Sequence, residues 1–382
     1  MTKMNVSRIG LNLLFLNPKL VGGSTKYGLN LLKELSSIDK INSYYVYINK
    51  ESLNLMPELG SNFVLRVLNF EYSNVFLRYF WEQIILPFYV FKDKIDLLHS
   101  LGYVIPLMAT TKSLVSILDI NYRGHSNNMS LVKRLMLGFM VNLSALFAKK
   151  IITISEFSKS QIIKYIKVKP NKVIVTLLSG SEDFQSETKV NAKLTLEKYE
   201  LDTDYIIAFS SPSLHKNIER LIEAVSSILN NDLNLKLLLV GHQDNSGNIK
   251  NSIINHHLSD KVVFTGFVPD EDIYPLLTHA RVFVFPSLYE GFGIPLLDAQ
   301  ACGVPVVSSN AGSLPEVGGS DVMYFDPYDI IEMKQSISNV LYDDLLAEFI
   351  VKAGLENRSQ FHWNKTAQNT LNTYQEILIS IQ

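Results

Sequence analysis

Short apolar runs alternate with longer amphipathic stretches along nearly the whole chain. Apolar runs of roughly four to eight residues bounded by turn residues are typical of buried strands, and apolar positions every three or four residues are typical of helices. Strands are predicted at residues 9–16, 44–49, 63–68, 95–99, 114–119, 151–154, 173–178, 205–210, 235–240, 261–265, 282–286, 304–308 and 322–325. Helices are predicted at 25–37, 76–91, 130–148 and 156–166, between the later strands, and at the end of the sequence. This alternation predicts α/β domains with parallel sheets and helices on both faces.

A length of 382 residues favours two domains. Residues 181–204 are polar and weakly periodic, so they are predicted to be the linker between the domains. We place the boundary between residues 1–183 and residues 184–360. Two doubly wound, Rossmann-like domains with a cleft between them would bind a ligand beyond the carboxyl ends of their strands.

The composition excludes some classes of function. A net charge of −2 gives no indication of a nucleic-acid partner. Cys302 is the single cysteine, so no internal disulfide is predicted, which fits a cytoplasmic location. No apolar segment has the length of a transmembrane helix. The stretch 135–148, LMLGFMVNLSALFA, suits either a core helix or a helix lying against a membrane surface, and we prefer the core helix.

Residues 287–307, SLYEGFGIPLLDAQACGVPVV, carry the most informative local pattern. Pro295 suits the first turn of a helix and Gly303 suits its C-terminal cap, so a helix is predicted at 295–302. The start of a helix is a natural phosphate seat. A tight turn in an α/β protein is the simpler interpretation. The two flanking acids, Glu290 and Asp298, instead favour a ligand with both phosphate and hydroxyl groups, such as a nucleotide sugar.

The longer stretch 287–319 resembles the donor-site signature of the retaining glycosyltransferases of family 4, which have the GT-B fold, and most of all their mannosyltransferase-like subgroup. Further segments resemble the family in the same order: 21–35, 78–87, 95–107, 148–180, 213–225, 237–243, 261–277 and 361–377. The resemblance therefore covers nearly the whole chain. It implies that the closing helices, about 361–382, pack back on the first domain.

The resemblance implies a donor site. Lys216 would neutralise the donor diphosphate, Glu290 would hold the transferred sugar, and Asp298 would bind the ribose. Asp298 replaces the usual glutamate and is shorter by about 1.5 Å, one carbon–carbon bond. Further donor contacts are implied at positions that offer backbone or small side chains: Gly22, Gly23, Ser211, Gly266, Phe267, Val268, Gly291, Phe292, Gly293 and Ile294. Ser211 stands where many relatives have an arginine.

The first domain departs from the family at one position. Leu118 stands where many members have a histidine that faces the reacting sugar, and Asp119 follows it. The resemblance gives Asp119 a catalytic role. Tyr27 and His125 are placed on the acceptor side.

These features predict a retaining hexosyltransferase for bacterial surface polysaccharide synthesis. Its donor would be a nucleotide sugar, with GDP-mannose as first choice and a UDP- or dTDP-sugar as the alternative. Its acceptor would be a hydroxyl group of a glycan or of a lipid-linked saccharide, reached by peripheral contact with the inner face of the cell membrane. Another enzyme of the same fold, or a non-catalytic nucleotide-sugar-binding or scaffold subunit, stays an alternative.

No cofactor or metal ion is expected. Lys216 and the helix start near Ile294 would balance the charge of the leaving phosphate. Of two Asp-x-Asp strings, 202–204 lies in or beside the predicted linker and 270–272 is predicted to cap a helix, and neither is expected to bind a metal ion.

Overall fold

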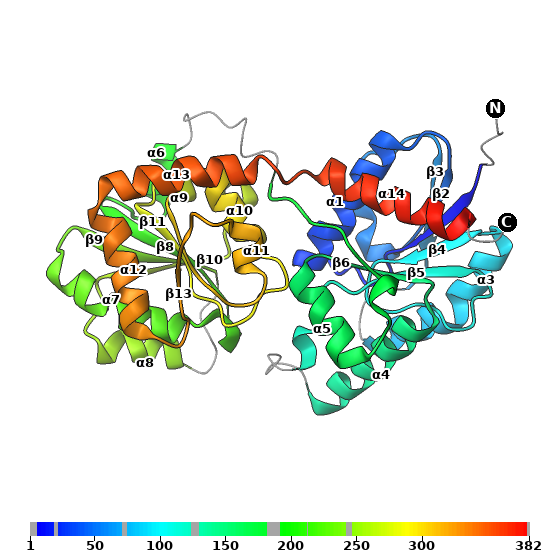
Figure 1. The fold of residues 1–382 in the computed structure, drawn as a ribbon, viewed down its shortest axis with the longest axis horizontal. Coiled ribbons are helices and arrows are strands. Elements are labelled where there is room, and N and C mark those ends of the chain that lie inside the picture. The colour runs from blue at the N-terminus through cyan, green and yellow to red at the C-terminus, as the bar shows by residue number, and fades with distance from the viewer. Residues whose placement is uncertain are drawn as a thin grey trace. The chain divides into compact units, whose positions relative to one another are not determined.

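The structure, a computed structural model, describes residues 6–18, 22–70, 75–123, 130–181, 192–211, 213–241 and 247–379, without the side chain of Val75. The chain forms two compact units (Figure 1). Unit 1 contains the residues up to 123 together with 130–178 and those from 362 onward, and unit 2 contains residues 179–361. The predicted boundary at 183/184 lies outside the described residues.

Unit 1 is built on a sheet of seven parallel strands in the order β3-β2-β1-β4-β5-β6-β7. The strands are β1 (Arg8–Asn12), β2 (Ser43–Asn49), β3 (Phe63–Leu68), β4 (Leu97–Ser100), β5 (Lys112–Ser116), β6 (Lys150–Thr153) and β7 (Val173–Val175). Chain order reverses between β1 and β4, which pair in parallel from Ile9↔Leu97 to Asn12↔Ser100. This is the doubly wound topology that the alternating pattern predicts.

Helices cover both faces of this sheet. They are α1 (Gly23–Ile38), α2 (Val75–Phe80), η2 (Trp81–Ile85), α3 (Leu86–Lys92), α4 (Leu131–Phe147), α5 (Glu156–Ile166) and α14 (Trp363–Ile379). α14 packs against α1. Leu98 of β4 packs with α3, and Val115 of β5 packs with α4 and α5. Leu98 pairs with Ser113, two residues before Val115, so Leu98 and Val115 point to the same face. Helices α3, α4 and α5 therefore share one face of the sheet.

A chain of buried polar side chains crosses the opposite face. The Tyr27 hydroxyl bonds the Ser116 hydroxyl at 2.7 Å, and Ser116 bonds His99 Nε2 at 2.8 Å. His99 Nδ1 then bonds the Tyr374 hydroxyl at 2.7 Å. All four side chains are fully buried, and burial lowers the pKa of His99 to about 3. The chain links α1, β5, β4 and α14, so it ties residues far apart in the sequence into one core.

His99 should make unit 1 sensitive to acid. Its pKa is about 3 in the folded protein and about 6.5 in an unfolded chain. The unfolded state therefore binds the extra proton first, and stability falls as pH decreases through this window by about 1.4 kcal/mol per pH unit. We expect the unfolding midpoint of unit 1 to fall more steeply between pH 6.5 and 4.5 in the wild type than in His99→Gln. Glutamine is neutral throughout and can bond both neighbours, so equal slopes would contradict this role.

Unit 2 is built on a second parallel sheet of six strands in the order β10-β9-β8-β11-β12-β13. The strands are β8 (Asp204–Ser210), β9 (Leu235–Gly241), β10 (Val262–Gly266), β11 (Val282–Phe285), β12 (Val306–Ser309) and β13 (Met323–Phe325). The helices are α6 (Ala192–Lys198), α7 (Ile218–Asn231), α8 (Asn248–Asn255), α9 (Asp270–Thr278), α10 (Ile294–Ala301), α11 (Leu314–Gly318), α12 (Ile330–Tyr342) and α13 (Asp344–Arg358). One apolar core lies between the sheet and α7, α8 and α12, and a second lies on the side of α9, α10 and α11.

Three predicted elements need correction. The strand at 9–16 ends at Asn12, because the Asn12 side chain accepts a hydrogen bond from the Leu14 amide and starts a turn. The helix at 76–91 is interrupted by the wider turn η2, just before Pro87. The linker at 181–204 includes helix α6, whose Lys198 binds Asp272 on α9 at 2.6 Å. Weak periodicity concealed this helix because it has only about two turns, with Leu194 exposed and Thr195 buried.

Within the described ranges, none of the helices is both long enough and apolar enough to cross a bilayer.

Candidate functional site

The sheet of unit 2 has a topological switch point between β8 and β11. From β8 the chain moves outward to β9 and β10, and from β11 it moves outward in the other direction to β12 and β13. The loops that follow β8 and β11 therefore diverge at the carboxyl edge of the sheet. In open parallel sheets this divergence makes a crevice in which ligands bind.

Lys216 and Glu290 meet at this switch point. Lys216 ends the short helix η7 (Leu214–Lys216) after β8, and Glu290 lies in the loop after β11. Lys216 Nζ lies 2.7 Å from Glu290 Oε1 and 5.3 Å from the ring centroid of Phe285. Only 20% of the lysine side chain and 16% of the glutamate side chain are exposed. The sequence singled out both residues, and the structure brings them into contact.

This arrangement can hold an anion and a hydroxyl-bearing group together. An ammonium group with little exposure to water forms strong charge-assisted bonds to phosphate oxygens. A carboxylate beside it can accept bonds from sugar hydroxyl groups. Because Glu290 already offsets the charge of Lys216, a bound phosphate would compete with the carboxylate for the same ammonium group.

Asn217 fixes the lysine loop to its neighbours. Its backbone is left-handed, with a φ of 59°, and its side-chain amide donates to the carbonyls of Pro286 at 3.0 Å and Pro327 at 2.8 Å. The Leu288 amide donates to the His215 carbonyl at 2.7 Å. The loops after β8 and β11 are therefore joined on both sides of Lys216. The sequence analysis did not single out Asn217, although asparagine tolerates a positive φ better than most residues.

Gly312 and Ser313 hold the backbone of Glu290. The Ser313 amide and hydroxyl both donate to the Glu290 carbonyl, at 3.2 and 3.0 Å. Gly312 has a φ of 65°, and a Cβ atom there would lie 2.6 Å from the Glu290 carbonyl oxygen and 2.9 Å from its amide nitrogen. The sequence analysis also missed these two residues. They lie inside the stretch 287–319, but their contacts with the backbone of Glu290 can be seen only in the structure.

Gly312→Ala should displace Glu290 and lower activity by at least about tenfold. The left-handed backbone alone costs about 1–2 kcal/mol with a side chain, and the new methyl group would also press on the glutamate backbone. Gly303→Ala is a matched control, because Gly303 has a φ of 67° but a Cβ there meets only Val351, at 3.8 Å. Thermal unfolding should show the cost of the left-handed backbone in both variants and a larger loss of stability in Gly312→Ala, and turnover should fall only in Gly312→Ala. Equal activity losses would contradict the argument.

Helix α10 begins one residue before the prediction, at Ile294, with Pro295 in its first turn. Gly293 precedes it with a φ of 110°, and a Cβ there would lie 2.7 Å from Leu314. The left-handed backbone favours glycine at this position, and a Cβ atom would also displace the end of the Leu314 side chain. The turn from Gly291 through Phe292 leads the chain from Glu290 to the helix start, where backbone N–H groups favour an anion.

Asp298 faces another part of unit 2. Only 8% of this residue is exposed, and its Oδ1 accepts a hydrogen bond of 2.7 Å from the Ser181 amide. Arg358 donates to the Ser181 carbonyl at 3.3 Å and to the Phe361 carbonyl at 2.6 Å. The first and last segments of unit 2 are thus tied to α10 and α13. The predicted ribose contact of Asp298 would have to coexist with its bond to Ser181. Cys302, one helical turn further, is buried, and this burial raises the pKa of its thiol, as expected for an unreactive residue.

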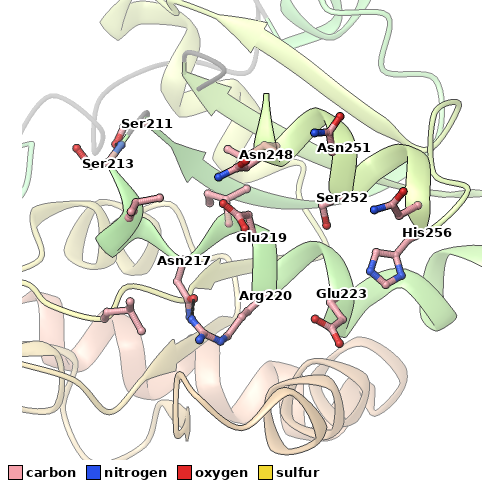
Figure 2. A pocket seen from close by; sticks show the side chains of 15 residues that line it. Ser211, Ser213, Asn217, Glu219, Arg220, Glu223, Asn248, Asn251, Ser252 and His256 are labelled. Carbon is pink, nitrogen blue, oxygen red and sulfur yellow. Dashed lines mark hydrogen bonds between the residues drawn. The ribbon is translucent and has the colours of Figure 1, made fainter. Parts of the chain in front are cut away.

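The remaining donor residues of unit 2 lie at the same edge of the sheet. Gly266 ends β10 at a bulge with a φ of 69°, Phe267 is 76% exposed, and Val268 is buried. Ser211 follows β8 and lines a pocket of about 710 Å³ between α7 and α8 (Figure 2). This pocket has a mostly polar lining that includes Glu219, Arg220, Glu223, Asn248, Asn251, Ser252 and His256. Of the predicted donor residues, only Ser211 lines it.

In unit 1, Gly22 caps α1 and Gly23 begins it, at the carboxyl edge of that sheet. A Cβ atom on either glycine would meet nothing within 4 Å, so the fold of unit 1 does not require glycine there. This open backbone agrees with close approach of a ligand, although a diphosphate contact stays a prediction.

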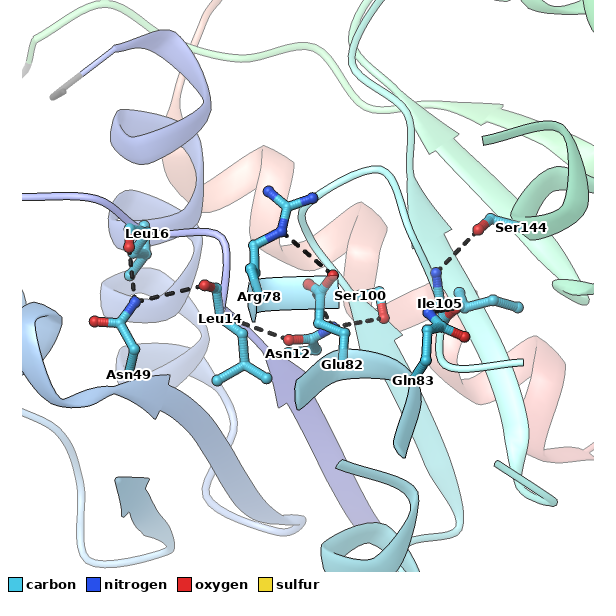
Figure 3. A network of polar contacts seen from close by, with 10 residues as sticks. All are labelled: Asn12, Leu14, Leu16, Asn49, Arg78, Glu82, Gln83, Ser100, Ile105 and Ser144. Carbon is cyan, nitrogen blue, oxygen red and sulfur yellow. Dashed lines mark hydrogen bonds and ion pairs between the residues drawn. The ribbon is translucent and has the colours of Figure 1, made fainter. Parts of the chain in front are cut away.

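A buried polar network supports the loop that follows β1 (Figure 3). Asn12 donates to Ser100 at 3.2 Å and to Glu82 at 3.5 Å, and Arg78 Nε lies 3.4 Å from Glu82 Oε2. Glu82 is fully buried, and burial raises its pKa. Asn49 donates to the Leu16 carbonyl at 2.7 Å. The loop leading toward Gly22 is therefore anchored from β2, β4 and η2.

The residues that the sequence analysis placed near the acceptor have different surroundings in unit 1. Tyr27 is fully buried and bonded to Ser116, so its side chain faces the core of unit 1 instead of a ligand surface, which corrects its assignment. Leu118 is 4% exposed and packed in the same unit. Asp119 accepts a bond from the Asn121 amide at 3.1 Å and thereby closes a turn, and its catalytic role stays a prediction. His125 lies outside the described residues.

Both Asp-x-Asp strings take part in contacts within unit 2. Asp202 pairs with Lys236 at 2.8 Å, and Asp204 lies 3.9 Å from Arg281. Asp270 and Asp272 stand in the first turn of α9, where negative charge is favourable. In the described part of the chain, no three His, Cys, Asp or Glu side chains cluster as metal ligands would.

Part of the chain is similar in sequence to known glycosyl transferases. Residues 193–370 match the sequence model of the family described as "Glycosyl transferases group 1". The chain is 34% identical to "O-antigen chain mannosyltransferase B" of Escherichia coli over 230 residues, 59% of this chain and 60% of that protein. It is 29% identical to "Serotype-specific mannosyltransferase WbdA" of Escherichia coli over 239 residues, 61% of this chain and 29% of that protein. The chain thus spans less than two thirds of each of these relatives.

Among solved structures, the fold is similar to that of Anabaena Alr3699/HepE in complex with UDP and glucose. The TM-score is 0.74 at 18% identity, and the match covers 97% of this chain and 100% of that one. This similarity confirms the predicted fold class, the GT-B fold with two Rossmann-like domains.

Proposed function

We propose that the protein transfers a hexose, in first place mannose, from a nucleotide sugar to a hydroxyl of a glycan or lipid-linked saccharide, because residues 193–370 match the sequence model of the group 1 glycosyl transferases. The observation that carries the proposal is the contact of Lys216 with Glu290 at the switch point of unit 2. The names of the two mannosyltransferase relatives support the choice of sugar and a role in surface polysaccharide synthesis.

In the proposed reaction the bond between the anomeric carbon and the diphosphate breaks as the acceptor hydroxyl attacks. Negative charge grows on the leaving phosphate, and Lys216 and the start of α10 stabilise it. Glu290 accepts hydrogen bonds from the sugar, which becomes electron-poor in a transition state of this kind. The acceptor hydroxyl attacks on the same face from which the diphosphate leaves, and the leaving phosphate accepts its proton. The anomeric configuration is thereby retained without a protein nucleophile.

A panel of nucleotide sugars tests the proposal. GDP-mannose, UDP-hexoses and a dTDP-hexose would be titrated onto the protein, and each would be followed for slow hydrolysis and for transfer to short mannosides. We expect GDP-mannose to bind and to turn over. Turnover of a UDP- or dTDP-sugar alone would replace the donor, and binding without any turnover would favour the non-catalytic alternative. Failure of every donor to bind would overturn the proposal.

We expect the reaction to proceed without a metal ion. Lys216 and the helix start would supply the positive charge, while acids of both Asp-x-Asp strings are engaged by cations of unit 2 such as Lys198 and Lys236. Activity after treatment with EDTA should stay within about twofold of the untreated protein. Loss of activity that Mg²⁺ or Mn²⁺ restores would show a metal-dependent mechanism instead.

A further inference from the structure

Helix α4 of unit 1 has charged residues only in its first turn, at Lys133 and Arg134, and is otherwise apolar on its outer side. Its buried side packs against the sheet through Val141, Ser144 and Ala145. The side facing solvent is largely apolar as well: apart from Lys133, its exposed residues are Leu131, Val132, Leu135, Phe139, Leu146 and Phe147, each of these six at least 58% exposed. A surface helix normally turns charged and polar residues to water. The exposed side of α4 therefore suits contact with an apolar partner better than contact with water. The sequence analysis preferred a core helix for this stretch, whereas in the structure only one side of the helix is buried.

A second apolar stripe runs along α2, η2 and α3. Phe76, Phe80, Ile84 and Phe88 follow one another at intervals of four residues, and each is at least 50% exposed. Phe91 continues the stripe and is 78% exposed. Side chains at this spacing lie along one side of a helix. Large aromatic groups in such a row are rare on a surface that faces only water.

The two apolar surfaces belong to one face of unit 1. Helices α3 and α4 cover the same side of the sheet, and the loop between β4 and β5 joins them. Gln83 of η2 donates to the Ile105 carbonyl at 2.9 Å, and the Ile105 amide donates to Ser144 of α4 at 3.0 Å (Figure 3). Met108 in this loop is 68% exposed. We call the exposed apolar side chains of α2–α3 and α4, with Met108, the apolar face of unit 1.

Positive charge is concentrated in the same part of the chain. Residues 75–181 contain 14 lysines and arginines and five aspartates and glutamates, a net charge of +9, whereas the whole chain carries −2. Lys133 and Arg134 stand on α4, which has no acidic residue. Lys149 follows the helix, and Lys172 donates to the Leu146 carbonyl at 2.7 Å. Among the described side chains, no ion pair joins Lys133, Arg134 or Lys149 to an acid.

We propose that the apolar face of unit 1 and its surrounding lysines and arginines bind the surface of an anionic lipid bilayer. Apolar side chains enter the boundary between headgroups and acyl chains, and the cations contact lipid phosphates. A second copy of the chain is a poor partner for this face, because the positively charged regions of the two copies would repel each other. This proposal assigns a surface to the peripheral membrane contact that the family resemblance implies, and it does not depend on the proposed sugar transfer.

Vesicle sedimentation tests the proposal on the whole protein without donor or acceptor. We expect the protein to pellet with vesicles of phosphatidylcholine containing about 30% phosphatidylglycerol and to stay in solution with phosphatidylcholine alone. Raising the salt concentration should weaken binding, because surface charges are screened. If the protein binds neither vesicle type, or binds both equally, the proposal is wrong.

Two double variants separate the contributions. Lys133→Gln/Arg134→Gln should lower the partition coefficient on anionic vesicles by at least about tenfold, since each basic residue near such a surface contributes about 1 kcal/mol. Leu135→Asn/Phe139→Asn should lower it similarly. Ile331→Asn/Leu345→Asn in unit 2 is the matched control, because both residues are 80% exposed. Unchanged binding by either unit 1 variant, or an equal loss in the control, would contradict the proposal.

Circular dichroism and donor binding should be unchanged in all three variants, because every substituted side chain is on the surface. Sedimentation velocity without lipid tests the other possible partner of this face, a second copy of the chain. A dimer of the wild type that Leu135→Asn/Phe139→Asn dissociates would assign the face to a second copy, and the membrane proposal would then be wrong.

Discussion

Lys216→Ala is expected to lower turnover at saturating donor by at least about a hundredfold while the protein stays folded. The reason is that a preorganised donor aimed at developing negative charge contributes two to three orders of magnitude, roughly, in a sheltered site. The side chain of Lys216 is only 20% exposed and lies at the switch point of unit 2. Single-turnover rates with the best donor of the panel measure the effect directly.

Lys236→Ala is the control for this prediction. Lys236 also forms an ion pair in unit 2, with Asp202 at 2.8 Å, but it lies on β9 away from the loops after β8 and β11. Its removal should leave turnover unchanged. Lys216→Arg should recover part of the activity, because charge is kept while the fork of the guanidinium replaces a compact ammonium group. Near-normal turnover in Lys216→Ala would remove the proposed role of the lysine.

Glu290→Gln is expected to separate turnover from binding. Glutamine keeps the size of the side chain but removes the negative charge beside the sugar, so turnover should fall by about a hundredfold. The same change leaves Lys216 without its carboxylate partner 2.7 Å away. The lysine then has no competitor for phosphate, and the affinity for a nucleoside diphosphate should stay the same or rise by up to about tenfold. Isothermal titration with GDP and UDP measures this second effect.

The double variant Lys216→Ala/Glu290→Gln tests whether the two residues act as a pair. Any gain in diphosphate affinity from Glu290→Gln should vanish when the lysine is absent, because the gain comes from the lysine alone. A gain that persists in the double variant would point to repulsion between Glu290 and the phosphate instead. Weaker diphosphate binding in the single variant, with turnover unchanged, would contradict the division of roles.

Much of the fold could be predicted because buried parallel strands leave continuous apolar runs. Runs such as 205–210 and 282–286 coincide with β8 and β11 within one residue. Element ends were less predictable, since they depend on single side chains such as Asn12, which bonds the Leu14 amide. Helix α6 was missed because seven residues give too few turns for a clear period.

The candidate site shows the same limit. Lys216 and Glu290 could be singled out because each lies in a recognisable local stretch. The bond between Asp298 and Ser181 joins positions 117 residues apart, and no local pattern encodes it. Tyr27 was placed on the acceptor side, yet helix α1 turns its phenol toward Ser116. For α4, periodicity could not separate core from surface, because both sides of the helix are apolar.

The return of α14 to unit 1 has a consequence for how the protein is made. His99 on β4 bonds Tyr374 on α14, so the core of unit 1 includes residues synthesised after all of unit 2. Unit 2 can fold as soon as residue 361 has left the ribosome, whereas unit 1 must wait for α14. A chain that ends before residue 363 and has been released from the ribosome should therefore hold a folded second unit and an incomplete first one, which chaperones and proteases can reach.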